Sequence, residues 1–65
     1  ILADVIILLV DEIPAHLKKG GIFITSGIID MKEQAVREAL EENEAFEIIE
    51  VTRQGEWVSF TARKK

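Results

Sequence analysis

The order of apolar and polar positions predicts five elements along the chain: a helix, a strand, a helix and two further strands. Over residues 2–18, apolar side chains recur every three or four positions, which is typical of a helix with one apolar face. Pro14 lies inside this pattern, where it removes a backbone donor and crowds the preceding turn. We therefore expect either a kink at Pro14 or a break, with a second short helix that starts at the proline.

A pair of glycines, Gly20 and Gly21, marks the end of this helical region. The lysines directly before them complement the helix dipole, and glycine adopts the left-handed conformation of many helix ends without strain. The apolar run that follows, residues 22–26, predicts a strand covered on both faces, as the parallel strands of α/β sheets are. Gly27 is expected to let the chain leave the sheet.

Residues 31–43 predict a second helix that is exposed on one side. Asp30 and Glu33 match a capping box, in which each side chain bonds a free backbone N–H at the helix start. Arg37 and Glu41 are spaced for an ion pair on the helix surface. The apolar face is narrow, and its members are Met31, Ala35, Val36, Ala39 and Leu40.

Two further strands, residues 46–53 and 56–62, are joined by a tight turn at Gln54-Gly55 and should therefore pair antiparallel. Alternation assigns the side chains of each strand to two faces. In the first of these strands, the predicted faces are Phe46, Ile48 and Glu50 against Glu47, Ile49 and Val51. In the second, they are Trp57, Ser59 and Thr61 against Glu56, Val58, Phe60 and Ala62. We interpret Trp57 as a core residue.

Together these elements predict an α/β fold with a three-stranded mixed sheet, and the 65 residues make up one domain at most. Successive right-handed crossovers place both helices on one face of the sheet. The opposite face and one edge strand then stay uncovered, and such surfaces pair with other chains. We expect the isolated chain to dimerise, to exchange strands or to aggregate.

Composition narrows the classes of function. The chain has 65 residues and a net charge of −4, and its only basic runs are residues 18–19 and 63–65, so we expect no direct binding to nucleic acid. Cysteine is absent, which fits a cytoplasmic location and leaves no thiolate for a metal or for catalysis. The apolar residues 1–10 have about half the length of a membrane-spanning helix. They also lack the flanks of a signal peptide, so no membrane association is expected.

Few side chains offer chemistry. His16 is the only histidine, and a lone histidine near a helix end usually faces solvent. We interpret Asp4 as a partner of the helix dipole. Ser26 lies at a strand end, where ligands gather in open α/β sheets, but no histidine–aspartate pair accompanies it. No catalytic residue and no metal site is therefore predicted, and the glutamates of the second helix are interpreted as a solvated face.

Five short motifs resemble one family of enzymes. They are Ile1-Leu2-Ala3-Asp4, Leu17-Lys18-Lys19-Gly20-Gly21, Ser26-Gly27-Ile28, Phe46-Glu47-Ile48-Ile49-Glu50 and Gly55-Glu56-Trp57-Val58. Over its whole length the chain is similar to the C-terminal end of the methyltransferases that modify the eleventh protein of the large ribosomal subunit. These are class I enzymes that depend on S-adenosylmethionine.

The resemblance implies a Rossmann-like sheet of seven strands, of which this chain supplies the last three, with the final strand inserted antiparallel between the other two. The family's glycine-rich cofactor loop and the acid that binds the ribose lie on earlier strands. We therefore expect a fragment that is inactive alone and binds no cofactor. Ile1 and Leu2 are implied to lie beside the cofactor and substrate cleft, and Ser26 and Gly27 at its rim. The sulfonium is already activated, so the enzyme mainly positions an amine.

We therefore expect part of a methyltransferase that N-methylates a ribosomal protein in the cytoplasm. Two alternatives stay open. One is a small α/β interaction module without catalysis. The other is a piece of a class I methyltransferase that acts on a small molecule or on RNA.

Overall fold

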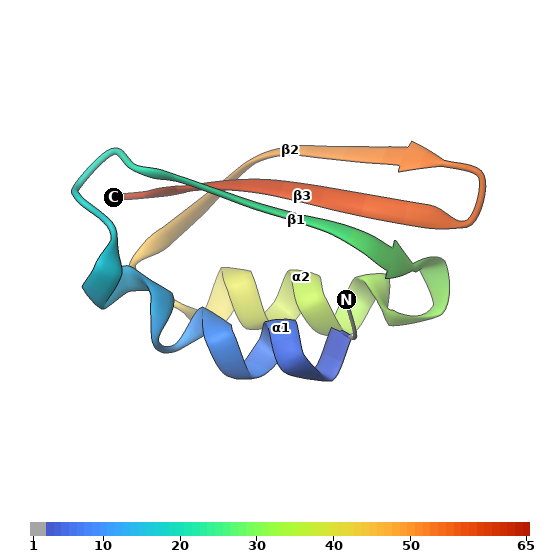
Figure 1. The fold of residues 1–65 in the computed structure, drawn as a ribbon, viewed down its shortest axis with the longest axis horizontal. Coiled ribbons are helices and arrows are strands. Elements are labelled where there is room, and N and C mark those ends of the chain that lie inside the picture. Colours follow the sequence, from blue (N-terminus) through green and yellow to red (C-terminus); the bar gives the residue numbers. More distant parts are fainter. Residues whose placement is uncertain (1–2) are drawn as a thin grey trace.

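The computed structural model describes residues 3–65 as two layers, a three-stranded sheet with two helices on one of its faces (Figure 1). The predicted α/β fold class and the placement of both helices on the same face are confirmed, but the three strands pair antiparallel and do not form the expected mixed sheet. In chain order the elements are α1 (Ala3–Val10), η1 (Ile13–His16), β1 (Ile22–Ile29), η2 (Asp30–Lys32), α2 (Glu33–Glu42), β2 (Phe46–Gln54) and β3 (Trp57–Lys64), where η marks a short 3₁₀ helix.

The strands lie in the order β1-β3-β2, so the last strand of the chain is inserted between the other two, as the resemblance implies. β3 is antiparallel to both neighbours, and β1 and β2 therefore run in the same direction. The apolar run of β1 is typical of a strand with a parallel neighbour. Within residues 3–65, however, its hydrogen-bonded neighbour is the antiparallel β3.

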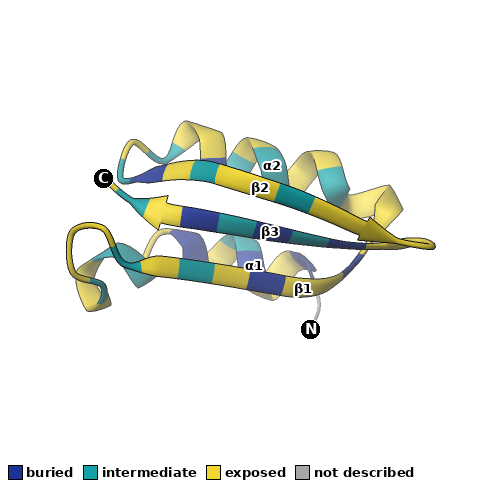
Figure 2. Cartoon of the chain, turned by 90° about the horizontal axis from the view of Figure 1, so that it is seen from above, coloured by how far each residue is buried: buried dark blue, intermediate teal, exposed yellow. Residues whose placement is uncertain are grey.

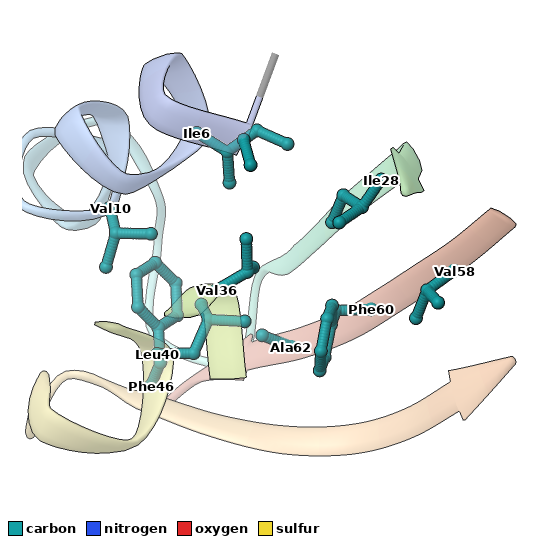
Figure 3. Close-up of a cluster of buried hydrophobic side chains, with 10 residues drawn as sticks. Ile6, Val10, Ile28, Val36, Leu40, Phe46, Val58, Phe60 and Ala62 are labelled. Atoms are coloured by element: carbon teal, nitrogen blue, oxygen red, sulfur yellow. The ribbon is translucent and has the colours of Figure 1, made fainter. Parts of the chain in front are cut away.

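The core lies between the sheet and the two helices (Figure 3). Phe60, on the central strand, is fully buried, and the alternation predicted for β3 is confirmed because Val58 and Ala62 share its face. Their burial against the helices is the main source of stability in so small a domain. The other buried apolar residues are Ala3, Ile6, Val10, Ile28, Val36, Leu40 and Phe46.

The helical region breaks at Pro14, and of the two predicted alternatives the break is the correct one. α1 ends at Val10, and Pro14 lies in the first turn of η1, where the absence of its N–H costs nothing. Lys64, near the end of the chain, donates from its ammonium group to the carbonyl oxygens of Pro14 and Leu17, the second at 2.7 Å. The break is therefore joined directly to the last strand.

β1 does not end at Ser26, because the chain passes Gly27 and stays in the sheet to Ile29. Gly27 has a φ of 73° and, with Ser26, forms a β-bulge in which two residues of β1 face one residue of β3. The bulge shifts the alternation by one residue. As a result, Thr25 and Ile28 both point into the core.

The predicted capping box is absent from the start of α2. Asp30 opens the 3₁₀ turn η2 instead, and neither helix start in this segment has a side-chain cap hydrogen bond. Glu33 bonds to Arg37 and Arg53, and it replaces Glu41 as the partner expected for Arg37. Two of the residues assigned to the apolar stripe, Val36 and Leu40, are buried as predicted, but Met31 is 82% exposed.

A second bulge, between Ile48 and Glu50, changes the faces of β2. The prediction placed Ile48 and Val51 on opposite faces. Both in fact pack against the core, while Ile49 is 51% exposed. The two-residue turn of the hairpin is Gly55-Glu56, one position later than predicted, because Gln54 still pairs with Trp57.

The sheet face opposite the helices is uncovered within the described part of the chain, as the placement of both helices on one face predicts (Figure 2). The cover on both faces that the apolar run of residues 22–26 indicated is not present there. The character of this face changes from strand to strand. The side along β1 is apolar, β3 contributes hydroxyl groups, one indole and Arg63, and β2 contributes Glu47 and Glu50 beside neutral residues. The large hydrophobic residues exposed on this face are Ile22, Ile24, Ile29, Ile49 and Trp57. Of residues 3–65, no helical segment has the length and hydrophobicity needed to cross a membrane.

Candidate functional site

An open hollow of about 480 Å³ lies on the helix-free face, at the end of the sheet that carries the β2–β3 hairpin. Both glycine-containing irregularities of the sheet, the β1 bulge and the hairpin turn, lie at this end. All three strands contribute to the hollow. Its lining residues are Ser26, Gly27, Thr52, Arg53, Gln54, Trp57 and Ser59.

The register of the sheet explains why these residues meet. The bulge at Ser26 and Gly27 lies opposite Ser59, which pairs on its other side with Thr52. Trp57 pairs with Gln54 at the base of the hairpin. Two of the sites named from the family resemblance, Ser26 and Gly27, therefore line one surface together with hydroxyl, amide and indole groups.

Trp57 is 52% exposed, so its interpretation as a core residue is wrong. The reason is the alternation of β3, which turns Phe60 into the core and Trp57, with Ser59, to the opposite face. An indole exposed among polar groups is typical of a binding surface, since its ring is apolar and its N–H can donate a hydrogen bond. The sequence did contain this signal, because Trp57 shares a predicted face with Ser59 and Thr61.

Arg53 supplies the only formal charge among the lining residues, and Glu33 of α2 holds it in place. The hydrogen bonds from Arg53 keep the pKa of Glu33 below its ordinary value. Partial desolvation acts in the opposite direction, and Arg37 adds a weaker lowering. The carboxylate thus stays ionised, and both of its oxygens accept hydrogen bonds from guanidinium groups. It serves to position Arg53.

The lining groups are suited to binding, not to proton transfer. None of these side chains is a carboxylate, an imidazole or a thiol. The hollow therefore does not have the composition of a binding site for S-adenosylmethionine, because it offers no acid for the hydroxyl groups of the ribose. It fits a role as one wall of a larger site.

The other candidate residues lie away from the hollow or outside the residues that the structure describes. Asp4 is exposed in the first turn of α1, as a dipole partner would be, and His16 is exposed in η1. Ile1 and Leu2, which the resemblance places beside the cofactor, lie outside the described residues. Over residues 3–65 no group of three His, Asp or Glu side chains is arranged to hold a metal ion.

Comparison with known proteins identifies the family of the chain. A family model described as "Ribosomal protein L11 methyltransferase (PrmA)" matches residues 1–65, the entire chain. The chain belongs to this methyltransferase family. The family assignment is independent of the geometry of the hollow, and it agrees with the resemblance carried by the five sequence motifs.

Two relatives with the name ribosomal protein L11 methyltransferase illustrate the similarity. The protein of Agathobacter rectalis is 58% identical over 64 residues, and that of Lachnospira eligens is 54% identical over 65 residues. These matches cover 98% and 100% of this chain but 20% of each relative. The chain thus spans about a fifth of the length of these methyltransferases.

A solved structure confirms the fold. The crystal structure of a ribosomal protein L11 methylase from Lactobacillus delbrueckii subsp. bulgaricus superposes with a TM-score of 0.91 at 32% sequence identity. The match covers 100% of this chain and 33% of the methylase chain. The arrangement of two helices under three strands is therefore a substructure of a larger methyltransferase.

Proposed function

We propose that the chain is the C-terminal part of an S-adenosylmethionine-dependent methyltransferase that methylates nitrogen atoms of a large-subunit ribosomal protein. The match of all 65 residues to the methyltransferase family carries the proposal. The cofactor, when bound, supplies an activated methyl group on its sulfonium. In this proposal the glycine-rich loop and the acid that bind it belong to parts of the enzyme that this chain does not span, and Ile1 and Leu2 lie at the edge of the cofactor cleft. The proposed substrate also implies a cytoplasmic location.

In this proposal the hollow is the part of the substrate site that this chain contributes. Ser26 and Gly27 form its rim, and Trp57 forms a wall on which an amine-bearing side chain rests. The face of an indole attracts a cation by about 0.5–1 kcal/mol at an exposed site. The hydroxyl of Ser59 and the amide of Gln54 are available to bind the substrate backbone. Methyl transfer of this kind needs an amine held in line with the methyl group, and positioning groups suffice for that.

The test uses a protein of the relatives' full length that contains this sequence. We expect it to transfer methyl groups to the ribosomal protein, detected as added methyl mass on the intact substrate. Trp57→Leu should lower kcat/KM for the protein substrate by about two- to fivefold, the equivalent of about 0.5–1 kcal/mol of lost interaction, and should leave the affinity for S-adenosylmethionine unchanged. Trp57→Phe keeps an aromatic face and should retain most of the activity.

Two results would contradict the proposal. Methyl transfer to ribosomal RNA or to a small molecule, with none to the protein, would favour the alternative substrate classes. Full activity of Trp57→Leu would remove the hollow from the substrate site while leaving the enzyme assignment intact.

The 65-residue chain by itself should bind no S-adenosylmethionine and methylate nothing. Isothermal titration of the isolated chain with the cofactor measures this directly. Binding of micromolar strength would show that the chain holds a cofactor site of its own, which the composition of the hollow does not support.

A further inference from the structure

Arg53 lies at the end of the sheet where open α/β proteins bind their ligands. β1 and β2 run in the same direction, and both end beside the hairpin turn (Figure 1). Ligands gather outside the carboxyl ends of such strands. Arg53 is the penultimate residue of β2 and one of the residues that line the hollow. Its surroundings are formed by α2 and β2, on the side of the sheet away from β1 (Figure 2).

The side chain of Arg53 uses one edge of its guanidinium group within the chain. Nε donates to Oε1 of Glu33 at 3.2 Å, and Nη2 donates to Oε2 of the same carboxylate. A guanidinium carries more donors than these bonds use, because Nη1 and the second N–H of Nη2 remain. Among residues 3–65 no further acceptor is bonded to this group, and the side chain is 56% exposed. The edge formed by Nη1 and Nη2 is thus available to an external acceptor.

Glu33 holds this edge in a fixed orientation. Its side chain is only 18% exposed, and it is also bound by Arg37 at 3.4 Å. The guanidinium of Arg37 in turn lies 5.5 Å from the centre of the ring of Phe60, on the central strand. Arg53 is therefore connected through one carboxylate to the core, and a side chain held in this way loses little further freedom when it binds a ligand.

The available edge of Arg53 is suited to a carboxylate. Parallel N–H groups of a guanidinium match the two oxygens of a carboxylate in a planar, directional contact that lysine cannot make. The two guanidinium groups and the one carboxylate of the cluster give it a net charge of +1, whereas the chain as a whole carries −4. An acidic group is therefore attracted to this position and repelled by the surface as a whole.

We propose that Arg53 is a specificity-determining residue that binds a carboxylate of the protein substrate, and that Glu33 is its positioning residue. Gln54, the next residue along β2, pairs with Trp57, so this position neighbours the wall on which the amine-bearing side chain rests. The carboxylate therefore belongs to an aspartate or glutamate close in sequence to the methylated residue. This inference rests on the proposed function, because it needs a protein substrate.

The first test compares variants of Arg53 in a protein of the relatives' full length that contains this sequence. Arg53→Met keeps the aliphatic stem and should raise KM for the ribosomal protein about five- to tenfold, because the substrate carboxylate loses its partner. Neither kcat nor the affinity for S-adenosylmethionine should change, since the contact is made equally in the ground state and the transition state. Arg53→Lys should lose nearly as much, because an ammonium group cannot hold both carboxylates edge-on. A normal KM for Arg53→Lys would overturn the role of the guanidinium edge.

A double-mutant cycle with the substrate identifies the carboxylate. Each Asp and Glu that neighbours the methylated residue of the ribosomal protein is replaced in turn by Asn or Gln. One replacement should raise the KM of the unmodified enzyme by the same factor as Arg53→Met, and it should have no further effect on the Arg53→Met enzyme. The inference is wrong if every replacement leaves KM unchanged, or if each adds its full effect to that of Arg53→Met.

The positioning role of Glu33 is tested by Glu33→Gln, which removes the charge that orients Arg53. KM for the ribosomal protein should rise about twofold or more, and the same substitution should leave KM unchanged in the Arg53→Met enzyme. Glu41→Gln, on the same helix, is the matched control and should have the KM of the unmodified enzyme. All assays are run well below the melting temperature of the least stable variant. An effect of Glu33→Gln on KM that persists without Arg53 would show a structural role only.

Failure of this inference can be told apart from failure of the proposed function. If the unmodified enzyme transfers no methyl group to the ribosomal protein, both fail together. If it does transfer methyl groups and Arg53→Met has the KM of the unmodified enzyme, the inference alone fails. A KM that responds to Arg53→Met but to no acidic residue of the substrate would also overturn it, because the ligand of Arg53 would then not be a substrate carboxylate.

Discussion

Glu33 shows how a single side chain can link separate parts of a small fold. It lies in the first turn of α2 and bonds to Arg53 at the end of β2, on the rim of the hollow. It also pairs with Arg37 at 3.4 Å, and the Arg37 guanidinium lies 5.5 Å from the centre of the Phe60 ring. One carboxylate therefore orients an arginine of the site and an arginine that covers the core.

This arrangement predicts a dependence of stability on pH. Because the hydrogen bonds from Arg53 lower the pKa of Glu33 in the folded state, its contribution is present above the ordinary glutamate pKa and is lost as the pH falls through the lower, folded-state value. Glu33→Gln should therefore be less stable than the unmodified chain at neutral pH, and the difference should vanish in acid. Urea denaturation across this pH range measures it. Glu41→Gln, on the exposed side of the same helix, should show no such difference.

At the scale of elements, the two β-bulges decide which side chains reach the core and which reach the hollow. The first has a local signal, because a glycine inside a strand often marks a bulge, and Gly27 provides it. The second is indicated only by the spacing of Phe46, Ile48 and Val51, which fits one face if an extra residue is inserted after Ile48. The prediction ended the first strand at Ser26 and applied strict alternation to residues 46–53, so it missed both bulges, since a bulge forms through pairing with a strand that is distant in sequence.

The β2–β3 hairpin gives a second prediction. Gly55 is the first residue of the two-residue turn and has a φ of 62°, while a Cβ built on it meets nothing within 4 Å. Replacement by alanine therefore costs only the strain of the left-handed conformation, about 1–2 kcal/mol. Gly55→Ala should lower the free energy of unfolding by this amount in urea denaturation. Gly55→Asn should lose less, because asparagine tolerates this conformation. Equal losses for the two variants would contradict this explanation.

At the scale of the whole molecule, the end of the chain joins three segments that are far apart in sequence. Lys64 exchanges backbone hydrogen bonds with Gly20 and Gly21, and the backbone of Lys65 donates to Ala45. The ammonium of Lys64 binds the carbonyl groups of Pro14 and Leu17. These contacts connect the loop before β1, the loop before β2 and the broken helix to the central strand.

We therefore predict that Lys64→Met is destabilising even though it keeps the aliphatic stem. Two carbonyl groups at the helix break lose a charged donor, and a hydrogen bond to a charged group is worth about 1.5–3 kcal/mol. The melting temperature should fall clearly for Lys64→Met and barely for Lys65→Met, whose side chain is exposed. A similar small change for both variants would show that the ammonium contributes little.

The sequence by itself determined the order of the elements, an irregularity of the helical region at Pro14, the alternation of β3 and the placement of both helices on one face. These features follow from periodicity, from proline chemistry and from the handedness of crossovers, all of which act within short stretches of chain. Only the tertiary structure decided the bulges, the exposure of Trp57 and the partners of Glu33. Each of these depends on which residue of a distant element lies opposite, and the pairing of distant elements is established only when the sheet and helices pack together.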